Sequence, residues 1–225
     1  NPQLRARAHM KFILGTKKNM TQIFDATGRA YPATILSAGP VIVTQVKTTA
    51  TDGYDAIQVG FGEQKEQRLG KAVVGHLKAV VAAGGEGALG NFRHLSEFRL
   101  TEEEAAKFKV GDRVDLSKFA EGDSVSVRSL SKGKGFQGAV KRHHFKGGPR
   151  THGQKHSERE VGSINGGGRV GSGRVAKGKR MPGRMGGDMV TVQNLKILQI
   201  RPETNELVLH GSLPGRKGVL VSIIA

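Results

Sequence analysis

The sequence contains no cysteine and no tryptophan, and aromatic residues make up only 5% of its 225 residues. The absence of cysteine excludes disulfide bonds, thiolate nucleophiles, iron–sulfur clusters and cysteine-ligated zinc. No stretch reaches the roughly 18 apolar residues that a membrane-spanning helix requires, which argues against an integral membrane protein. Residues 1–9 include basic side chains but no apolar stretch follows them, so we expect no secretory signal.

Acidic residues are scarce where the basic ones gather. The net charge is +17, and residues 128–188 hold 15 basic and 3 acidic side chains. Residues 1–20 hold five basic side chains and no acidic one, whereas the remaining 144 residues are neutral overall. Because solubility alone would not require such segregation, the pattern favours a polyanionic partner.

The basic segment 128–188 is also rich in glycine, with 16 of the 33 glycines and only two aromatic residues. It is too polar to bury a core of its own, and coreless segments of this length are usually functional or disordered. A disordered linker is one interpretation. The irregular mixture of cations, glycines and single apolar residues favours a segment that becomes ordered on its partner, because glycine permits close approach and cations neutralise phosphate.

The rest of the chain reads as many short strands separated by turn signals, which predicts a closed barrel or a sandwich. Residues 71–83 have the apolar spacing of a helix ending at Gly84-Gly85, and Thr101 precedes an acidic helix start. The chain is expected to leave the barrel near 130 and to re-enter it near 189, and a small α/β insertion is expected at about 60–105. The predicted strands are 12–15, 21–24, 31–36, 41–46, 56–59, 92–100, 114–116, 124–130, 189–200, 206–210 and 218–224.

Two glycine runs, 133–138 and 166–171, match the dinucleotide-binding pattern G-x-G-x-x-G. Such a site requires a parallel strand–helix–strand unit, and no second parallel strand is visible here. A nucleotide-binding enzyme using Gly133, Gly135 and Gly138 is therefore kept only as an alternative, and no cofactor is expected.

Four histidines, at 143, 144, 152 and 156, raise the possibility of a metal site. Their spacing matches no zinc motif and no carboxylate pair accompanies them, so imidazoles near phosphates or bases are at least as plausible. Carboxylates are nearly absent where the cations gather, which leaves acid–base catalysis without an obvious site.

The basic residues of the segment form two runs without neutralising acids. If about ten of them met phosphates, the logarithm of the binding constant would fall with the logarithm of salt concentration at a slope of about −7 to −9. The scarcity of aromatic residues argues against a single-strand stacking platform, so a structured RNA fits better, with a free DNA-binding protein as the alternative. The runs are Lys132, Lys134, Lys141, Arg142, Lys146 and Arg150, then Arg169, Arg174, Lys177, Lys179, Arg180 and Arg184.

Several short motifs, in order along the chain, resemble the bacterial-type family of large-subunit ribosomal protein L3. The resemblance runs from about residue 10 to the C-terminus. The motifs are GTKKNMTQIF at 15–24, SKGKGFQG at 131–138 followed by Lys141-Arg142, THG at 151–153, GSI at 162–164, KGKRMPGRMG at 177–186 and VTVQNL at 190–195.

The resemblance implies a mainly β protein: a translation-factor-like barrel with a small α/β insertion and a long basic extension at 131–188. Residues 10–130 and 189–225 would form the barrel body, and residues 1–9 an extension before the family's usual start. It further implies a cytoplasmic, ribosomal, non-enzymatic protein that binds large-subunit ribosomal RNA, contacts neighbouring ribosomal proteins and takes no small-molecule substrate. It would help nucleate the subunit, with its extension reaching toward the peptidyl-transferase centre.

Residues expected to contact RNA combine the cations, glycines and single ring of the matching motifs. They are Lys17, Lys18, Lys132, Gly133, Lys134, Gly135, Phe136, Lys141, Arg142, His152, Gly153, Arg169, Arg174, Lys177, Lys179, Arg180 and Arg184. The chain departs from the family at Asn19, where glycine is usual, and at His143, where tryptophan is common. The segment 165–173 is longer and richer in glycine than its usual counterpart.

Overall fold

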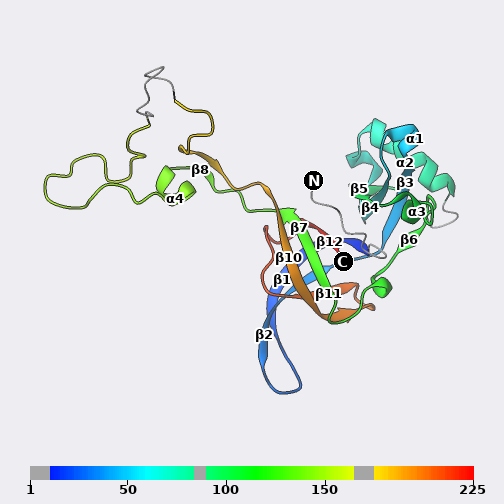
Figure 1. Ribbon diagram of the computed structural model, residues 1–225. Helices are drawn as coiled ribbons and strands as arrows, with labels where there is room; N and C mark the ends of the chain where they lie inside the picture. The colour runs from blue at the N-terminus through cyan, green and yellow to red at the C-terminus, as the bar shows by residue number, and fades with distance from the viewer. Residues whose placement is uncertain (1–10, 84–89, 165–174) are drawn as a thin grey trace. The chain divides into compact units, whose positions relative to one another are not determined.

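The computed structural model describes residues 11–83, 90–164 and 175–225, and the chain divides into two units (Figure 1). The first unit, here called the body, includes the chain up to Leu130 and again from Met189 onward. The second, here called the arm, runs from Ser131 to Asp188. The predicted C-cap at Gly84-Gly85 and the second glycine run, at 166–171, lie outside the described residues.

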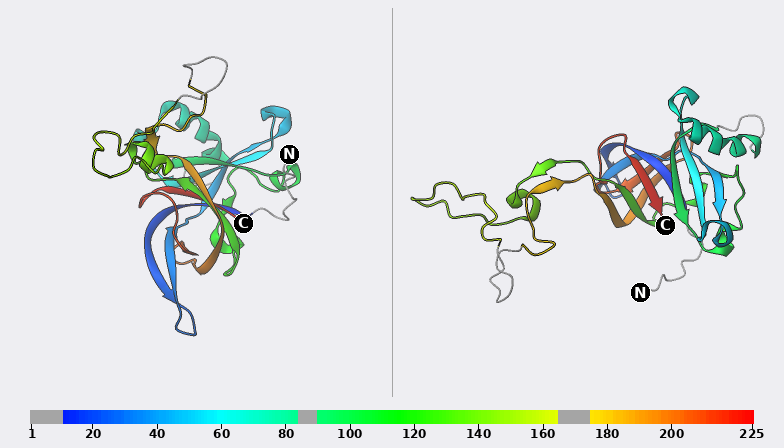
Figure 2. Two further views of the ribbon diagram at one scale, coloured as in Figure 1. Left: turned by 60° about the vertical axis from the view of Figure 1, so that its left-hand side comes forward. Right: turned by 90° about the horizontal axis from the view of Figure 1, so that it is seen from above.

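A closed barrel of six strands forms one part of the body, in the order β1-β12-β7-β10-β11-β2, and every neighbouring pair is antiparallel. Strands from both ends of the chain meet in it: the neighbouring strands β1 and β2, in blue, are flanked by β12 and β11, in orange to red, and green β7 lies between β12 and β10 (Figure 2). This confirms the predicted mainly β class with a barrel. The strands are β1 (Phe12–Phe24), β2 (Ala30–Ser37), β7 (Ser124–Leu130), β10 (Met189–Arg201), β11 (Glu206–His210) and β12 (Leu220–Ile224).

Strand β1 is continuous, so the predicted break between 15 and 21 is wrong. Lys17 pairs with Leu36 of β2, and pairing resumes at Met20 and Thr34 after a register shift. A bulge of this kind inserts extra residues without ending the ladder. The polar run between the two apolar segments therefore marks an irregularity in one strand and not a turn.

A second sheet in the body has four antiparallel strands in the order β5-β4-β3-β6. They are β3 (Val41–Lys47), β4 (Ala56–Glu63), β5 (Phe92–Arg99) and β6 (Arg113–Val114). The sheet thus draws on a wider span than the insertion expected at about 60–105. The predicted strand 114–116 ends at Val114, because Leu116–Lys118 forms the 3₁₀ helix η2.

Helix α2 (Lys71–Ala83), predicted from its apolar spacing, packs on this sheet. Leu77 and Val80 are buried against Phe92, with Ile42 and Leu95 beside them. The apolar stripe is therefore a packing surface. The remaining short helices of the body are α1 (Thr49–Asp52), η1 (Glu66–Arg68) and α3 (Glu102–Ala105), the last with a capping box between Thr101 and Glu104.

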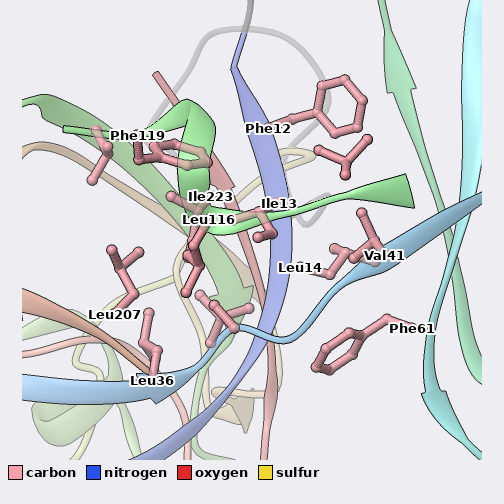
Figure 3. Packing of buried hydrophobic residues seen from close by; sticks show 14 of the residues in the cluster. Phe12, Ile13, Leu14, Leu36, Val41, Phe61, Leu116, Phe119, Leu207 and Ile223 are labelled. Atoms are coloured by element: carbon pink, nitrogen blue, oxygen red, sulfur yellow. The ribbon is translucent and has the colours of Figure 1, made fainter. Parts of the chain in front are cut away.

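One apolar core joins the barrel to the second sheet. At the start of β1 both faces are buried: Phe12 and Leu14 point to the side where Val41 lies (Figure 3), and Ile13 between them is buried on the opposite face of the strand. Phe12 also stacks on Phe98 of β5, with 4.6 Å between ring centroids. This double burial explains why β1 opens with consecutive apolar residues and not with alternation.

A polar network crosses the second sheet at Lys47 and Glu97. The Lys47 ammonium lies 2.8 Å from Glu97 Oε1, and Tyr54 Oη donates to Glu97 Oε2 over 2.9 Å. The hydrogen bond from Lys47 is the main reason that the pKa of the Glu97 carboxyl lies below its ordinary value, although burial opposes the shift. The ion pair therefore stabilises the ionised carboxylate of the folded state.

The variant Glu97→Gln should unfold more easily at pH 7, by up to about 1 kcal/mol, because it loses this partly exposed pair. The Glu97 pKa is lower in the folded state, so its contribution is present above the ordinary value of 4.5 and is lost as the pH falls through the lowered pKa. Urea unfolding between pH 7 and pH 2.5 would measure this. Glu63→Gln, on β4, is the control, and a pH-independent difference for Glu97→Gln would contradict the assignment.

Candidate nucleic-acid interface

The two ends of the arm meet in a short ribbon of antiparallel backbone. Strand β8 (Gly135–Gln137) pairs with β9 (Gly183–Met185), and Phe136 lies directly opposite Arg184. Ser131 N donates to Asp188 O over 2.9 Å, and Lys134 N donates to Met185 O over 2.9 Å. The outgoing and returning chains are therefore tied together along the base of the arm.

Helix α4 (Ala139–His143) follows the ribbon directly and is fixed to the returning chain. Arg142 Nη1 donates to Met181 O over 2.8 Å, and His143 Nε2 lies 3.1 Å from the same oxygen. Gly183 leaves room for the guanidinium, since a Cβ there would lie 2.5 Å from Arg142 Nη1. Arg142 and His143 thus position the arm's own backbone, which sequence reasoning did not anticipate because Met181 is 39 residues from Arg142.

A closed loop occupies 147–158. Gly148 N donates to Glu158 O over 2.9 Å, and Arg150 forms an ion pair with the Glu158 carboxylate. Gly147 has a φ of +77°, and a Cβ there would collide with Glu158 O. Glycine at 147 is therefore required both by backbone conformation and by the close approach of the two chains.

Substituting Gly147→Ala should open this loop and weaken binding of the full chain to its polyanionic partner by about tenfold. A left-handed alanine alone costs about 1–2 kcal/mol, and the contact with Glu158 O adds to that. Gly138→Ala is the matched control, because a Cβ at Gly138 meets nothing within 4 Å. Filter binding of both variants would measure the effect, and equal affinities would show that the loop does not matter for binding.

Most of the predicted RNA-contacting residues that the structure describes are exposed. Arg142 is half-buried, and Arg169 and Arg174 lie outside the described residues. Lys155 on the loop and Arg159 just after it are also exposed, and the same charge count could have singled out both cations. The exposed predicted residues are Lys132, Gly133, Lys134, Gly135, Phe136, Lys141, His152, Gly153, Lys177, Lys179, Arg180 and Arg184.

Lys17 and Lys18, by contrast, have partners within the barrel. The Lys17 ammonium donates to Leu213 O over 2.6 Å and to Gly215 O over 3.3 Å. The Lys18 ammonium lies 2.8 Å from Glu206 Oε1 and lowers the pKa of that carboxyl. Lys17 therefore holds the connection between β11 and β12 against β1, and Lys18 links β1 to β11; RNA contact by both lysines stays a prediction.

The arm's charge is largely uncompensated. Residues 131–146 and 175–187 together hold nine basic side chains and no acidic one. The arm has three acidic residues, Glu158, Glu160 and Asp188. Of these, Glu158 forms an ion pair with Arg150. Among the described residues of the arm, Ala139 is the only fully buried hydrophobic residue, so local order here rests on backbone hydrogen bonds and not on a core.

The alternative sites have no structural support in the described part of the chain. No group of three His, Cys, Asp or Glu side chains there is arranged to hold a metal ion. Strand β8 pairs with antiparallel β9, whereas a dinucleotide site requires a parallel strand–helix–strand unit. None of the helices described is long and apolar enough to cross a membrane.

Comparison with known proteins decides the family. A sequence model of the family described as Ribosomal protein L3 matches residues 94–220, which is more than half of the chain. The "Large ribosomal subunit protein uL3" of Gloeothece citriformis is 48% identical over 212 residues, covering 94% of both chains. The chain belongs to the ribosomal protein L3 family.

Other relatives of the same name match over similar lengths. That of Thermosynechococcus vestitus is 46% identical over 211 residues, covering 94% of both chains. That of Chlorobium limicola is 44% identical over 217 residues, covering 96% of this chain and 99% of the relative. These matches confirm the resemblance seen in the sequence. Members of the ribosomal protein L3 family are structural constituents of the large subunit that bind ribosomal RNA, so the expected function and the expectation of a protein that is not an enzyme are confirmed as well.

Proposed function

We propose that the arm is the main element through which this member of the ribosomal protein L3 family binds large-subunit ribosomal RNA. One observation carries the proposal: nine basic side chains and no acidic one lie in 131–146 and 175–187, and all but the half-buried Arg142 are exposed. Phosphate neutralisation by such cations supplies most of the non-specific affinity for nucleic acid. The body provides the stable fold into which the arm is inserted between Leu130 and Met189.

The predicted contact residues of the arm fall into two groups under this proposal. The exposed lysines and arginines neutralise phosphates, whereas Gly133, Gly135 and Gly153 let RNA approach the backbone closely, with His152 beside Gly153. Arg142 acts indirectly by holding α4 against the returning chain. The exposure of the other cations and the hydrogen bond from Arg142 to Met181 O support this division of roles.

Binding to large-subunit RNA can be tested by sedimentation. Ribosomes washed in high salt should retain the full chain in the large-subunit peak in near-stoichiometric amount. A variant whose arm is replaced by an Asn-Gly turn is the comparison, since Leu130 and Met189 are directly opposite each other in the ladder of β7 and β10. The arm-less chain should be lost in the wash. Equal retention of the two chains would place RNA binding in the body instead.

The position of the arm inside the subunit can be tested by directed cleavage of RNA. Because the chain has no cysteine, His152→Cys introduces a single thiol to which an iron chelate can be attached. We propose that the arm reaches toward the peptidyl-transferase centre, so hydroxyl radicals from this site should cut RNA there. Lys107→Cys, on the exposed surface of the body, is the control and should cut elsewhere.

An early role in assembly is part of the same proposal. The full chain should bind large-subunit ribosomal RNA that carries no other protein, because the arm supplies its own electrostatic affinity. Order-of-addition reconstitution would measure this. A requirement for other proteins before binding would contradict a nucleating role.

A further inference from the structure

Phe136 is the most exposed of the large hydrophobic side chains that the structure describes, with 76% of its surface accessible. An exposed phenyl ring forgoes the favourable free energy of burial, since burying an aromatic side chain removes about 150–250 Å² of surface from solvent. Within the described residues the ring makes no stacking or cation contact. Its exposure suggests a surface that another molecule covers.

The ring is held in a defined place on the ribbon. Phe136 is the central residue of β8 and lies directly opposite Arg184, so the two side chains leave the ribbon on the same face. The ribbon is tied on one side by Lys134 N to Met185 O and on the other by the contact of Arg142 with Met181 O. An aromatic ring fixed in this way can receive a flat partner with little loss of conformational freedom.

The side chain opposite is an unpaired cation. Arg184 is exposed, and the described residues offer its guanidinium no carboxylate and no hydrogen-bond acceptor. Its terminal nitrogen lies close to Gly187, where a Cβ would be 2.8 Å from Nη2. A ring and a free guanidinium side by side match the two parts of a nucleotide, a base that stacks and a phosphate that accepts hydrogen bonds.

We infer that Phe136 is a stacking site for one unpaired base of the large-subunit RNA, and that Arg184 binds the phosphate of that nucleotide or its neighbour. The inference rests on the proposed RNA-binding function of the arm and names a single subsite within it. One ring serves one base, so this is no strand-binding groove of the kind that the low aromatic content excludes. It is an anchoring point within a contact made mostly to phosphates.

Charge favours a nucleotide over an apolar pocket on a neighbouring protein. Segments 131–146 and 175–187, which contain the ring and its surroundings, hold nine cations and no acid. A protein pocket that covered the ring would have to supply acidic groups around an apolar centre to face them. Each nucleotide of an RNA is linked to a phosphate on its 5′ side and its 3′ side, so an RNA offers a base for the ring and anionic groups for the cations at once.

Ultraviolet crosslinking of the unmodified chain tests the inference directly. Large subunits containing the full chain are irradiated at short wavelength, and tryptic peptides carrying a nucleotide are identified by mass spectrometry. Trypsin cleaves after Lys134 and after Lys141, and the resulting peptide 135–141 contains Phe136 as its only aromatic residue. We expect a nucleotide attached at Phe136. Absence of this adduct, in subunits where other arm peptides do crosslink, would overturn the inference.

Three substitutions separate stacking from apolar filling. Phe136→Tyr keeps a ring and should bind RNA within about twofold of the unmodified chain, whereas Phe136→Leu and Phe136→Ala should both bind about tenfold more weakly. Base–aromatic stacking of the magnitude seen at other sites predicts a loss of this size. Ile164→Ala is the matched control, an exposed apolar residue of the arm without a ring, and should change little.

The outcomes are distinguishable from failure of the proposed function. If Phe136→Leu binds as well as the unmodified chain and only Phe136→Ala fails, the ring fills an apolar pocket of a neighbouring protein and the stacking site is wrong. If all three bind equally, the ring has no role. If the unmodified chain itself is absent from washed large subunits, the arm's RNA-binding function fails before the subsite is in question.

Discussion

Neutralising eight exposed cations of the arm should lower affinity for large-subunit ribosomal RNA by about 1,000-fold at 0.1 M salt. Each phosphate contact releases condensed counterions, so the slope of log binding constant against log salt should become shallower by about 5–7. Arg142 is left in place because it holds Met181 O and its loss would disturb the fold of the arm. The eight, each changed to glutamine, are Lys132, Lys134, Lys141, Lys146, Lys177, Lys179, Arg180 and Arg184.

The control removes lysines from the body. Five lysines of the body serve as the control set: they are exposed like the cations of the arm, but they lie among acidic residues in a neutral part of the chain. Changing them should alter the salt slope by less than about one, because few of them should meet a phosphate. An equal effect of the two sets would mean that binding follows total charge and not the arm. The control lysines are Lys65, Lys71, Lys78, Lys107 and Lys109.

The variant Phe12→Ala should destabilise the body by about 3–5 kcal/mol. Phe12 is 2% exposed and stacks on Phe98, with a second ring, Phe108, at 5.8 Å between centroids. Because Phe12 belongs to a barrel strand and Phe98 to the second sheet, the cavity would open where the two meet. Denaturant unfolding of the full chain would measure the loss.

Phe24→Ala provides a matched comparison on the same strand. Phe24 is 60% exposed, so its removal should change the free energy of unfolding by less than about 0.5 kcal/mol. A large effect at Phe24, or a small one at Phe12, would show that the core does not join the barrel and the sheet as described.

Alternation and turn signals were sufficient to predict a closed barrel or a sandwich, because each side chain on a strand faces either the core or the solvent, and the family resemblance then favoured the barrel. Strand β7 shows the pattern well, with Val125, Val127 and Ser129 buried, Ser126 half-buried and Arg128 exposed. At β1 the same reasoning failed, because a bulge keeps the strand continuous through a polar run. The pairing order of the strands depends on contacts between distant residues and could not be derived from local pattern.

The arm illustrates a different limit. Its charge, glycine content and family motifs identified it as the candidate RNA interface, since these are properties of composition and of short runs. The bond from Arg142 to Met181 O and the pairing of Lys18 with Glu206 join residues 39 and 188 positions apart, so no local signal reports them. For that reason the predicted RNA-contacting residues include both cations that bind the chain itself and cations that face solvent.

The pairing of Leu130 with Met189 has a consequence for the energetics of the free protein. In the ladder, β7 and β10 form a hairpin whose connection is the 58 residues from Ser131 to Asp188. Closing a flexible connection of that length costs about 3 kcal/mol more entropy than closing a two-residue turn. Folding of the body therefore carries a loop-closure cost that a short turn would avoid, and the shortened chain with an Asn-Gly turn should be the more stable of the two in isolation.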